Sequence, residues 1–133
     1  MNYILDTDII SYIIKGRGGV IGQIAAYNFQ SLAITSITVA EVLYGLEISP
    51  KYNKLYPFVK DLLNSFLHLD FNKKSAEIFA KIKSNLKKKG NLLADADLMI
   101  SSICLENNCS LITNNIKHFS RIKALSLKPI NFG

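Results

Sequence analysis

Cysteine is scarce in this sequence, and its scarcity excludes two ways of stabilising a fold. Cys104 and Cys109 are the only two cysteines. They are too few for a disulfide framework and are not spaced as zinc ligands. We expect them to be buried thiols in a reducing compartment, which favours the cytoplasm. His68 and His118 have no cysteine or histidine nearby in the sequence, so a zinc site is not expected.

Long apolar runs are also missing. No segment approaches the ~18 consecutive apolar residues of a membrane-spanning helix. Asp6 and Asp8 interrupt the apolar stretch near the N-terminus, and no basic leader precedes it. Neither membrane insertion nor secretion is therefore expected. Of the 133 residues, 49% are apolar and 20% are charged, which is typical of one globular domain, here residues 1–133, with a substantial core.

Acidic residues are outnumbered, since 10 aspartates and glutamates stand against 16 lysines and arginines and leave a formal net charge of +6. An excess of this sign favours polyanions such as nucleic acids, through attraction and counterion release. Two basic clusters are candidates for phosphate contact, although a solvated surface is the commoner explanation: Lys81, Lys83, Lys87, Lys88 and Lys89, and Lys117, His118, Arg121 and Lys123.

Short apolar segments alternate with segments of helical periodicity. Strands are predicted at residues 3–5, 32–35, within 66–71, at 110–113 and near 125–130. Helices are predicted at residues 7–15, 20–29, 36–48, 55–66, 72–89 and 95–108. This alternation predicts an α/β fold, a single domain whose central and mostly parallel β-sheet is flanked by helices on both faces. In such sheets, functional sites form at the carboxyl ends of the strands.

Three separate segments place an acid near that edge of the predicted sheet. Asp6 follows the first strand, Glu41 lies in the helix after the second, and Asp97 lies at the start of the helix before the strand at 110–113. Each has an ordinary explanation when taken singly. Asp6 and Asp95 are each placed to cap a helix, and Asp97 follows Asp95 in a first helical turn, where acids are common.

Glu41 would close a capping box if its helix began at Thr38. Ser36 is an equally good cap, and a helix that begins there places Glu41 in the second turn, where it needs another purpose. Taken together, carboxylates that approach within a few ångströms repel one another, and one takes up a proton unless a cation neutralises them. Oxygen ligands with open coordination positions suit Mg²⁺ or Mn²⁺, which can activate water and stabilise charge on a phosphate.

Four stretches carry a resemblance to a known family: YILDTDIISYII at 3–14, TSITVAEVLYGLE at 35–47, DLMISSICLENNCSLITNNIKHFSRI at 97–122 and LSLKPINF at 125–132. In order and spacing they resemble the PIN-domain ribonucleases, specifically the VapC toxins of type II toxin–antitoxin systems. The resemblance implies that Asp6, Glu41 and Asp97 form an acidic cluster that binds Mg²⁺ or Mn²⁺ and hydrolyses RNA. It favours Asp97 over Asp95, because Asp97 precedes the LMISS segment at the family's spacing.

Residues around the acids complete the expected site. Thr7, Ser36 and Thr113 could position a water molecule or a carboxylate by hydrogen bonds, and Asn115 stands where many PIN domains carry a fourth acid. Asp8 stands where asparagine is common in the family, and its role is left open, as is that of Asp95. The family also implies a VapB-like antitoxin that blocks the cleft, a homodimer, and operator DNA that is bound only through the antitoxin.

The leading hypothesis is a metal-dependent endoribonuclease, and two alternatives stay open. A phosphoacceptor receiver domain is also a parallel α/β fold that binds Mg²⁺, and Asp70, Thr113 and Lys128 fall near its landmarks. That alternative leaves Glu41 and Asp97 unexplained. A nucleic-acid-binding protein without catalysis would fit the net charge, with the acids serving only as helix caps.

Overall fold

The computed structural model describes residues 2–131, so residues 1, 132 and 133 of the predicted domain, including the last residue of the LSLKPINF motif, lie outside the description. The strands are β1 (Tyr3–Leu5), β2 (Leu32–Thr35), β3 (Leu67–Leu69), β4 (Ser110–Thr113) and β5 (Leu127–Pro129). The α-helices are α1 (Thr7–Ile14), α2 (Val20–Ala25), α3 (Ser36–Glu47), α4 (Tyr52–Asn64), α5 (Lys73–Lys88), α6 (Asp95–Glu106) and α7 (Ile116–Phe119). A short 3-10 helix, Phe29–Ser31, precedes β2. None of the described helices is long and apolar enough to cross a membrane.

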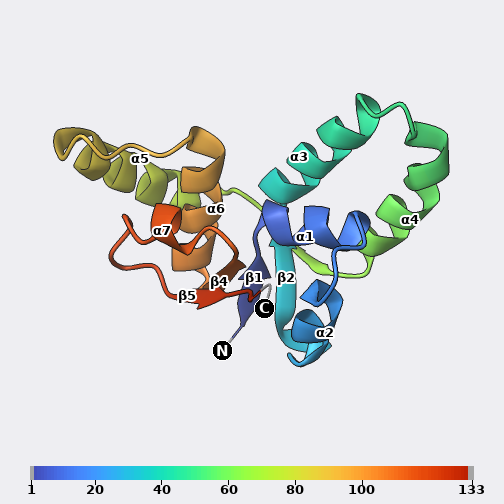
Figure 1. Cartoon of the computed structure of the whole chain (residues 1–133). Coiled ribbons are helices and arrows are strands. Elements are labelled where there is room, and N and C mark those ends of the chain that lie inside the picture. The colour runs from blue at the N-terminus through green and yellow to red at the C-terminus, as the bar shows by residue number, and fades with distance from the viewer. Residues whose placement is uncertain (1, 132–133) are drawn as a thin grey trace.

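The five strands form one sheet in the order β3-β2-β1-β4-β5, and all neighbouring strands run parallel (Figure 1). The predicted α/β fold is thus confirmed. From β1 in the middle, the chain moves outward through β2 to β3 at one edge. It then crosses back to β4 and β5 on the other side of β1. A reversal of strand order of this kind opens a crevice at the carboxyl ends of β1 and β4.

Each face of the sheet is covered by its own group of helices. In Figure 1, α1 to α4 lie on one side of the sheet and α5 to α7 on the other. The strands are apolar on both faces because successive side chains point to opposite sides. Leu5 packs with Ile9 in the core on the α1 side, whereas its neighbour Ile4 packs with Leu98 in the core on the α6 side. The two cores hold the sheet rigidly between them.

Three local features differ from the sequence prediction. The helix predicted at 20–29 ends at Ala25, because Asn28 forms a tight turn in which its side-chain oxygen accepts the N–H of Gln30 at 3.1 Å. Helix α4 begins at Tyr52, three residues before the predicted start at residue 55, and it contains Pro57. The four-residue helix α7 was not predicted, because one turn is too short to produce a periodic pattern.

The strand order also decides one of the alternatives. β3 and β5 are the two opposite edges of the sheet. Asp70, which follows β3, and Lys128, which lies in β5, are therefore separated by the width of the sheet. A receiver-like site built from both of them is not supported.

The core side chains of β4 should dominate the stability of the fold. Ile112 is fully buried, so Ile112→Ala leaves a cavity and is expected to lower the free energy of unfolding by about 2–5 kcal/mol. Leu67→Ala on the edge strand β3 is the control, because Leu67 is 62% exposed, and it should change stability by less than about 0.5 kcal/mol. Urea denaturation measures both, and equal losses in the two variants would contradict this description of the core.

Candidate active site

The acids gather where the topology opens the sheet. Asp6 directly follows β1, and its backbone N–H donates to the carbonyl of Ile112 in β4 at 2.9 Å, which joins the two strand ends. Thr113 is the last residue of β4. Asp6 and Thr113 therefore lie side by side at the carboxyl ends of adjacent strands, where the strand order reverses.

Asp6 is buried, with only 5% of its surface exposed, and both of its carboxylate oxygens accept hydrogen bonds. Oδ1 accepts the backbone N–H of Thr7 at 2.9 Å, so Asp6 caps α1 as the sequence predicts. Oδ2 accepts the hydroxyl of Thr113 at 2.8 Å. Capping therefore engages one of the two oxygens, and the other is turned toward the neighbouring strand.

Asp8 lies in the first turn of α1 and enters the same site. Its Oδ2 accepts the backbone N–H of Asn114 at 3.1 Å and lies 3.5 Å from the hydroxyl oxygen of Thr113. Its Oδ1 is buried and has no hydrogen-bond partner among the described residues. A buried carboxylate oxygen without a donor is unfavourable, so this position suits a proton or a cation.

The proximity of Asp6 and Asp8 changes their acidity. The pKa of the Asp6 carboxyl is raised to about 8, mainly by burial and next by the charge of Asp8, with a smaller contribution from Asp97. Hydrogen bonds from Thr113 and Thr7 act in the opposite direction without cancelling the effect. Burial also raises the pKa of the Asp8 carboxyl. Two carboxyls that resist ionisation side by side form a site that a divalent cation would stabilise.

Glu41 lies on α3, whose cap differs from both predicted caps. Thr35, at the end of β2, caps the helix because its Oγ1 accepts the N–H of Thr38 at 3.1 Å. The helix begins at Ser36, which puts Glu41 in the second turn. From there Glu41 contacts α1 instead of its own helix end, since the Thr7 hydroxyl donates to its Oε1 at 2.7 Å.

A chain of hydroxyl groups leads to that contact. The hydroxyl oxygens of Thr35 and Thr38 are 3.5 Å apart, and those of Thr38 and Thr7 are 2.9 Å apart. A hydroxyl has one proton to donate. Because Thr7 gives its proton to Glu41, it accepts from Thr38, so the chain of donors points toward the carboxylate. Glu41 is exposed, and this chain is what orients it.

Asp97 lies in the first turn of α6 and is held from α7. Its Oδ2 is 2.9 Å from Nε2 of His118, and about a quarter of each side chain is exposed, 28% and 25%. Asp95 does not cap α6, because the cap position is Ala94. It forms an ion pair with Lys83 of α5 at 2.8 Å instead. Of the two acids, Asp97 is the one whose charge acts on Asp6.

The structure thus brings the predicted residues to one edge of the sheet. Thr7 and Thr113 make the hydrogen bonds to carboxylates that were expected of them. Ser36 makes none to an acid among the described residues, and Asn115 is exposed, with its backbone N–H donating to Thr113 Oγ1 at 3.0 Å. Within residues 2–131, no three side chains of His, Cys, Asp or Glu are grouped closely enough to hold a metal ion as they stand.

Two residues of the site were not assigned to it from the sequence. Asp8 had no assigned role, although its spacing from Asp6 in the D-T-D triplet was a usable signal, because both acids fall at one helix start. His118 was placed only in a basic cluster. Its pairing with Asp97 depends on how α7 packs beside α6, which no local pattern reveals.

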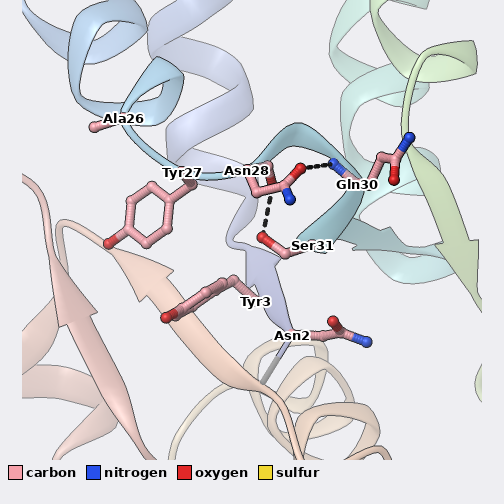
Figure 2. Close-up of a pocket in the computed structure, with 7 residues that line it drawn as sticks. All are labelled: Asn2, Tyr3, Ala26, Tyr27, Asn28, Gln30 and Ser31. Carbon is pink, nitrogen blue, oxygen red and sulfur yellow. Dashed lines mark hydrogen bonds between the residues drawn. The ribbon is translucent and has the colours of Figure 1, made fainter.

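One hollow lies beside the site and another lies at the far end of the strands. A groove of about 300 Å³ lies between α1, α3 and α4 beside Glu41, with apolar walls that include Leu46 and Val59. A wider hollow of about 580 Å³ lies at the opposite, amino end of the strands, where Figure 2 shows Tyr3 and Tyr27 on one side. All of its lining side chains are uncharged, so it offers none of the acid–base or metal chemistry of the carboxyl edge.

Comparisons with known proteins agree with this geometry. The family model of the PIN domain matches residues 3–125. Ribonuclease VapC2 of Haemophilus influenzae is 34% identical over 125 residues, covering 94% of this chain and 95% of that protein. The tRNA(fMet)-specific endonuclease VapC of Salmonella typhimurium is 26% identical over 96% of this chain and 97% of its own length. Among solved structures, VapBC2 from Rickettsia felis, bound to a DNA fragment from its promoter, aligns with a TM-score of 0.89 at 32% identity, covering 98% of this chain and all of that one.

The doubly covered parallel sheet with acids at its carboxyl edge is the fold of the PIN-domain family. The chain belongs to that family, and its relatives place it among the VapC ribonucleases. The resemblance carried by the four sequence motifs is confirmed.

The raised pKa of Asp6 predicts how stability depends on pH in metal-free buffer. Between the usual pKa of about 4 and the folded value of about 8, the folded state binds more protons than the unfolded state. The free energy of unfolding therefore falls as pH rises through this window, by up to about 1.4 kcal/mol per pH unit. Asp6→Asn should flatten this fall. The melting temperature of the variant should therefore rise relative to that of wild type as pH increases.

Thermal melts with a chelator from pH 4 to pH 9 measure this difference. Asp61→Asn, which removes an exposed carboxylate on α4, is the matched control and should follow the wild-type profile. Parallel profiles for Asp6→Asn and wild type would show that Asp6 ionises normally in the folded protein.

Proposed function

We propose that this protein is the toxin of a toxin–antitoxin pair and acts as a Mg²⁺- or Mn²⁺-dependent endoribonuclease that hydrolyses RNA phosphodiester bonds. The observation that carries the proposal is the buried Asp6 beside the half-buried Asp8 at the reversal of strand order, where one buried oxygen of Asp8 has no donor among the described residues. A pair of this kind is costly as a mere helix cap, because a single exposed acid would cap as well. A non-catalytic nucleic-acid-binding protein has no use for it.

The residues present suit a hard divalent cation. Asp6 and Asp97 would hold the ion, with Glu41 as a further ligand, directly or through water. Mg²⁺ usually keeps several waters and binds through one or two carboxylates, so a closed cage of three acids is not required. When bound, such an ion lowers the pKa of a coordinated water and stabilises charge on a phosphate.

The chain's own residues fix the carboxylates in place. Thr113 and the N–H of Thr7 orient Asp6, the Thr7 hydroxyl orients Glu41, and His118 orients Asp97. Fixed carboxylates need no reorganisation when charge develops on a phosphate, which is the main source of electrostatic catalysis. Burial of the Asp6 and Asp8 pair supplies the driving force for taking up a cation, since neutralisation removes their mutual repulsion.

The substrate and partners are inferred from chemistry and from relatives. The net charge of +6 favours RNA as a polyanion, and one relative is named for cleavage of tRNA(fMet). The Rickettsia felis structure is a toxin–antitoxin complex on promoter DNA. We extend this to a VapB-like antitoxin for the present chain, with a homodimeric toxin in the cytoplasm and DNA contacted through the antitoxin.

Two aspartates in the same turn of α6 give a matched test of the catalytic assignment. Asp97→Asn removes a charge that faces the site and should lower the rate of RNA cleavage by about a hundredfold or more. Asp95→Asn breaks an exposed ion pair with Lys83 and should change the rate by less than about twofold. Cleavage of labelled RNA by purified protein measures both. Wild-type activity in Asp97→Asn would refute the assignment.

Metal binding has a readout that does not depend on activity. Mn²⁺ at about a hundredfold excess over its Kd should stabilise the folded protein by about 2.7 kcal/mol, seen as a rise in melting temperature. Asp6→Asn should lose most of this rise, whereas Asp95→Asn should keep it. An equal rise in all three proteins would place the ion elsewhere on the chain.

A further inference from the structure

We propose that a basic pocket beside α5 is a second RNA-binding site that grips a backbone phosphate away from the scissile bond. This proposal rests on the proposed function, since it presumes an RNA substrate. The pocket has a volume of about 280 Å³ and lies between α5, α6 and the segment after α7. We call it the lysine pocket, and its polar lining comprises Lys81, Asn85, Lys89, Arg121 and Lys123.

Members of both basic clusters meet in this pocket, although those that line it lie at least 32 positions apart in the sequence. Lys81 on α5 and Lys89, the residue that caps the end of α5, stand eight residues apart with Asn85 midway between them. Arg121 and Lys123 come from the segment that follows α7. A lysine run on a solvated helix face would have no reason to converge with a second cluster.

The charges of the lysine pocket are not neutralised. No aspartate or glutamate lines it, and none of its four cations forms an ion pair with a described residue. Lys83, on the same helix, shows the contrast because it is paired with Asp95. Four cations around one cavity repel one another, and an anion bound among them would remove that repulsion.

The floor and rim of the pocket suit a nucleotide unit. The floor is apolar and includes Leu86 and Ile122, which are 3% and 5% exposed, so it can contact a ribose while the rim contacts phosphate. Arg121 is oriented by donating from Nη1 to the carbonyl of Leu92 at 3.0 Å. A guanidinium has five N–H donors in a fixed fork, so this bond leaves donors for a phosphate.

The position of the lysine pocket connects it with the candidate active site. Arg121 follows His118 by one turn, its N–H donating to the His118 carbonyl at 3.4 Å, and His118 holds Asp97. Leu92, which orients Arg121, lies in the segment that leads into α6. One RNA strand that passes the acids along α7 would therefore reach the pocket, which makes it a determinant of affinity for longer RNAs.

Equilibrium binding tests the pocket without cleavage. Unfractionated tRNA is titrated with full-length protein in EDTA, and fluorescence anisotropy is recorded over a series of salt concentrations. Lys81→Gln/Lys123→Gln removes two charges from the pocket, and Lys87→Gln/Lys88→Gln removes two exposed charges from α5 outside it. The pocket variant should weaken binding by about tenfold and reduce the slope of log K against log salt by about 1.5. The control variant should weaken it less than about threefold.

Cleavage assays separate this inference from the proposed function. With Mg²⁺, the pocket variant should raise KM for tRNA without changing kcat, and should cleave a trinucleotide RNA as fast as wild type. Equal loss of affinity in both double variants, or no loss in either, would overturn the pocket while leaving the nuclease intact. If no protein cleaves RNA but the difference in binding persists, the proposed catalysis fails and the pocket stands.

Discussion

The fold is organised around one unfavourable arrangement, the buried carboxyl of Asp6 beside the half-buried carboxyl of Asp8 at the end of the central strand. Removing Asp6 and Asp8 from water costs free energy that only donors, protons or cations return. The protein supplies donors from three places: the N-terminus of α1, the hydroxyl that ends β4 and the backbone just beyond it. All three donors reach the two carboxyls because β1 lies beside β4 and the chain leaves both strands at the same edge of the sheet. One oxygen of Asp8 still has no donor among the described residues, and a bound cation would relieve this imbalance.

The two halves of the molecule each contribute one further acid to this edge. Glu41 comes from the group of helices on one face and is fixed by the threonine hydroxyls that cap α3 and begin α1. Asp97 comes from the other face and is fixed by His118. Neither is fixed by the central pair, and within residues 2–131 no three acids are grouped closely enough to hold a metal ion as they stand. The sheet therefore sets the separation of Glu41 and Asp97, and each of them is oriented by a residue on its own side of the sheet. Changes in the packing of α3 or α6 would move one acid relative to the other.

Much of the architecture was readable because parallel strands buried on both faces have a simple signature. YIL, LAIT and SLIT are short apolar runs bounded by polar residues, and each became a strand. Asp6 and Asp97 could be placed from their position after a strand and before a helix. The failures have other causes. The ion pair of Asp95 and the partner of His118 depend on which segments meet in space. The cap of α3 was missed for a local reason, because Thr38 and Ser36 were equal candidates whereas α3 starts directly after β2, so that Thr35 accepts the N–H of Thr38.

The distribution of charge bears on how a basic protein can bind RNA beside an acidic site. The crevice repels phosphate as long as its carboxylates are ionised, so attraction cannot originate there. The attraction must come from cations placed outside the crevice. The lysine pocket supplies four, and one of them, Arg121, lies three residues after His118, the partner of Asp97. A divalent ion in the crevice would reverse the local sign and allow the held strand to approach. On this view binding and cleavage are carried by separate sets of charges. The acids at the start of α6 and the cations of the lysine pocket are therefore separate groups of opposite charge. The acids cannot attract phosphate, and the cations cannot hold a divalent ion.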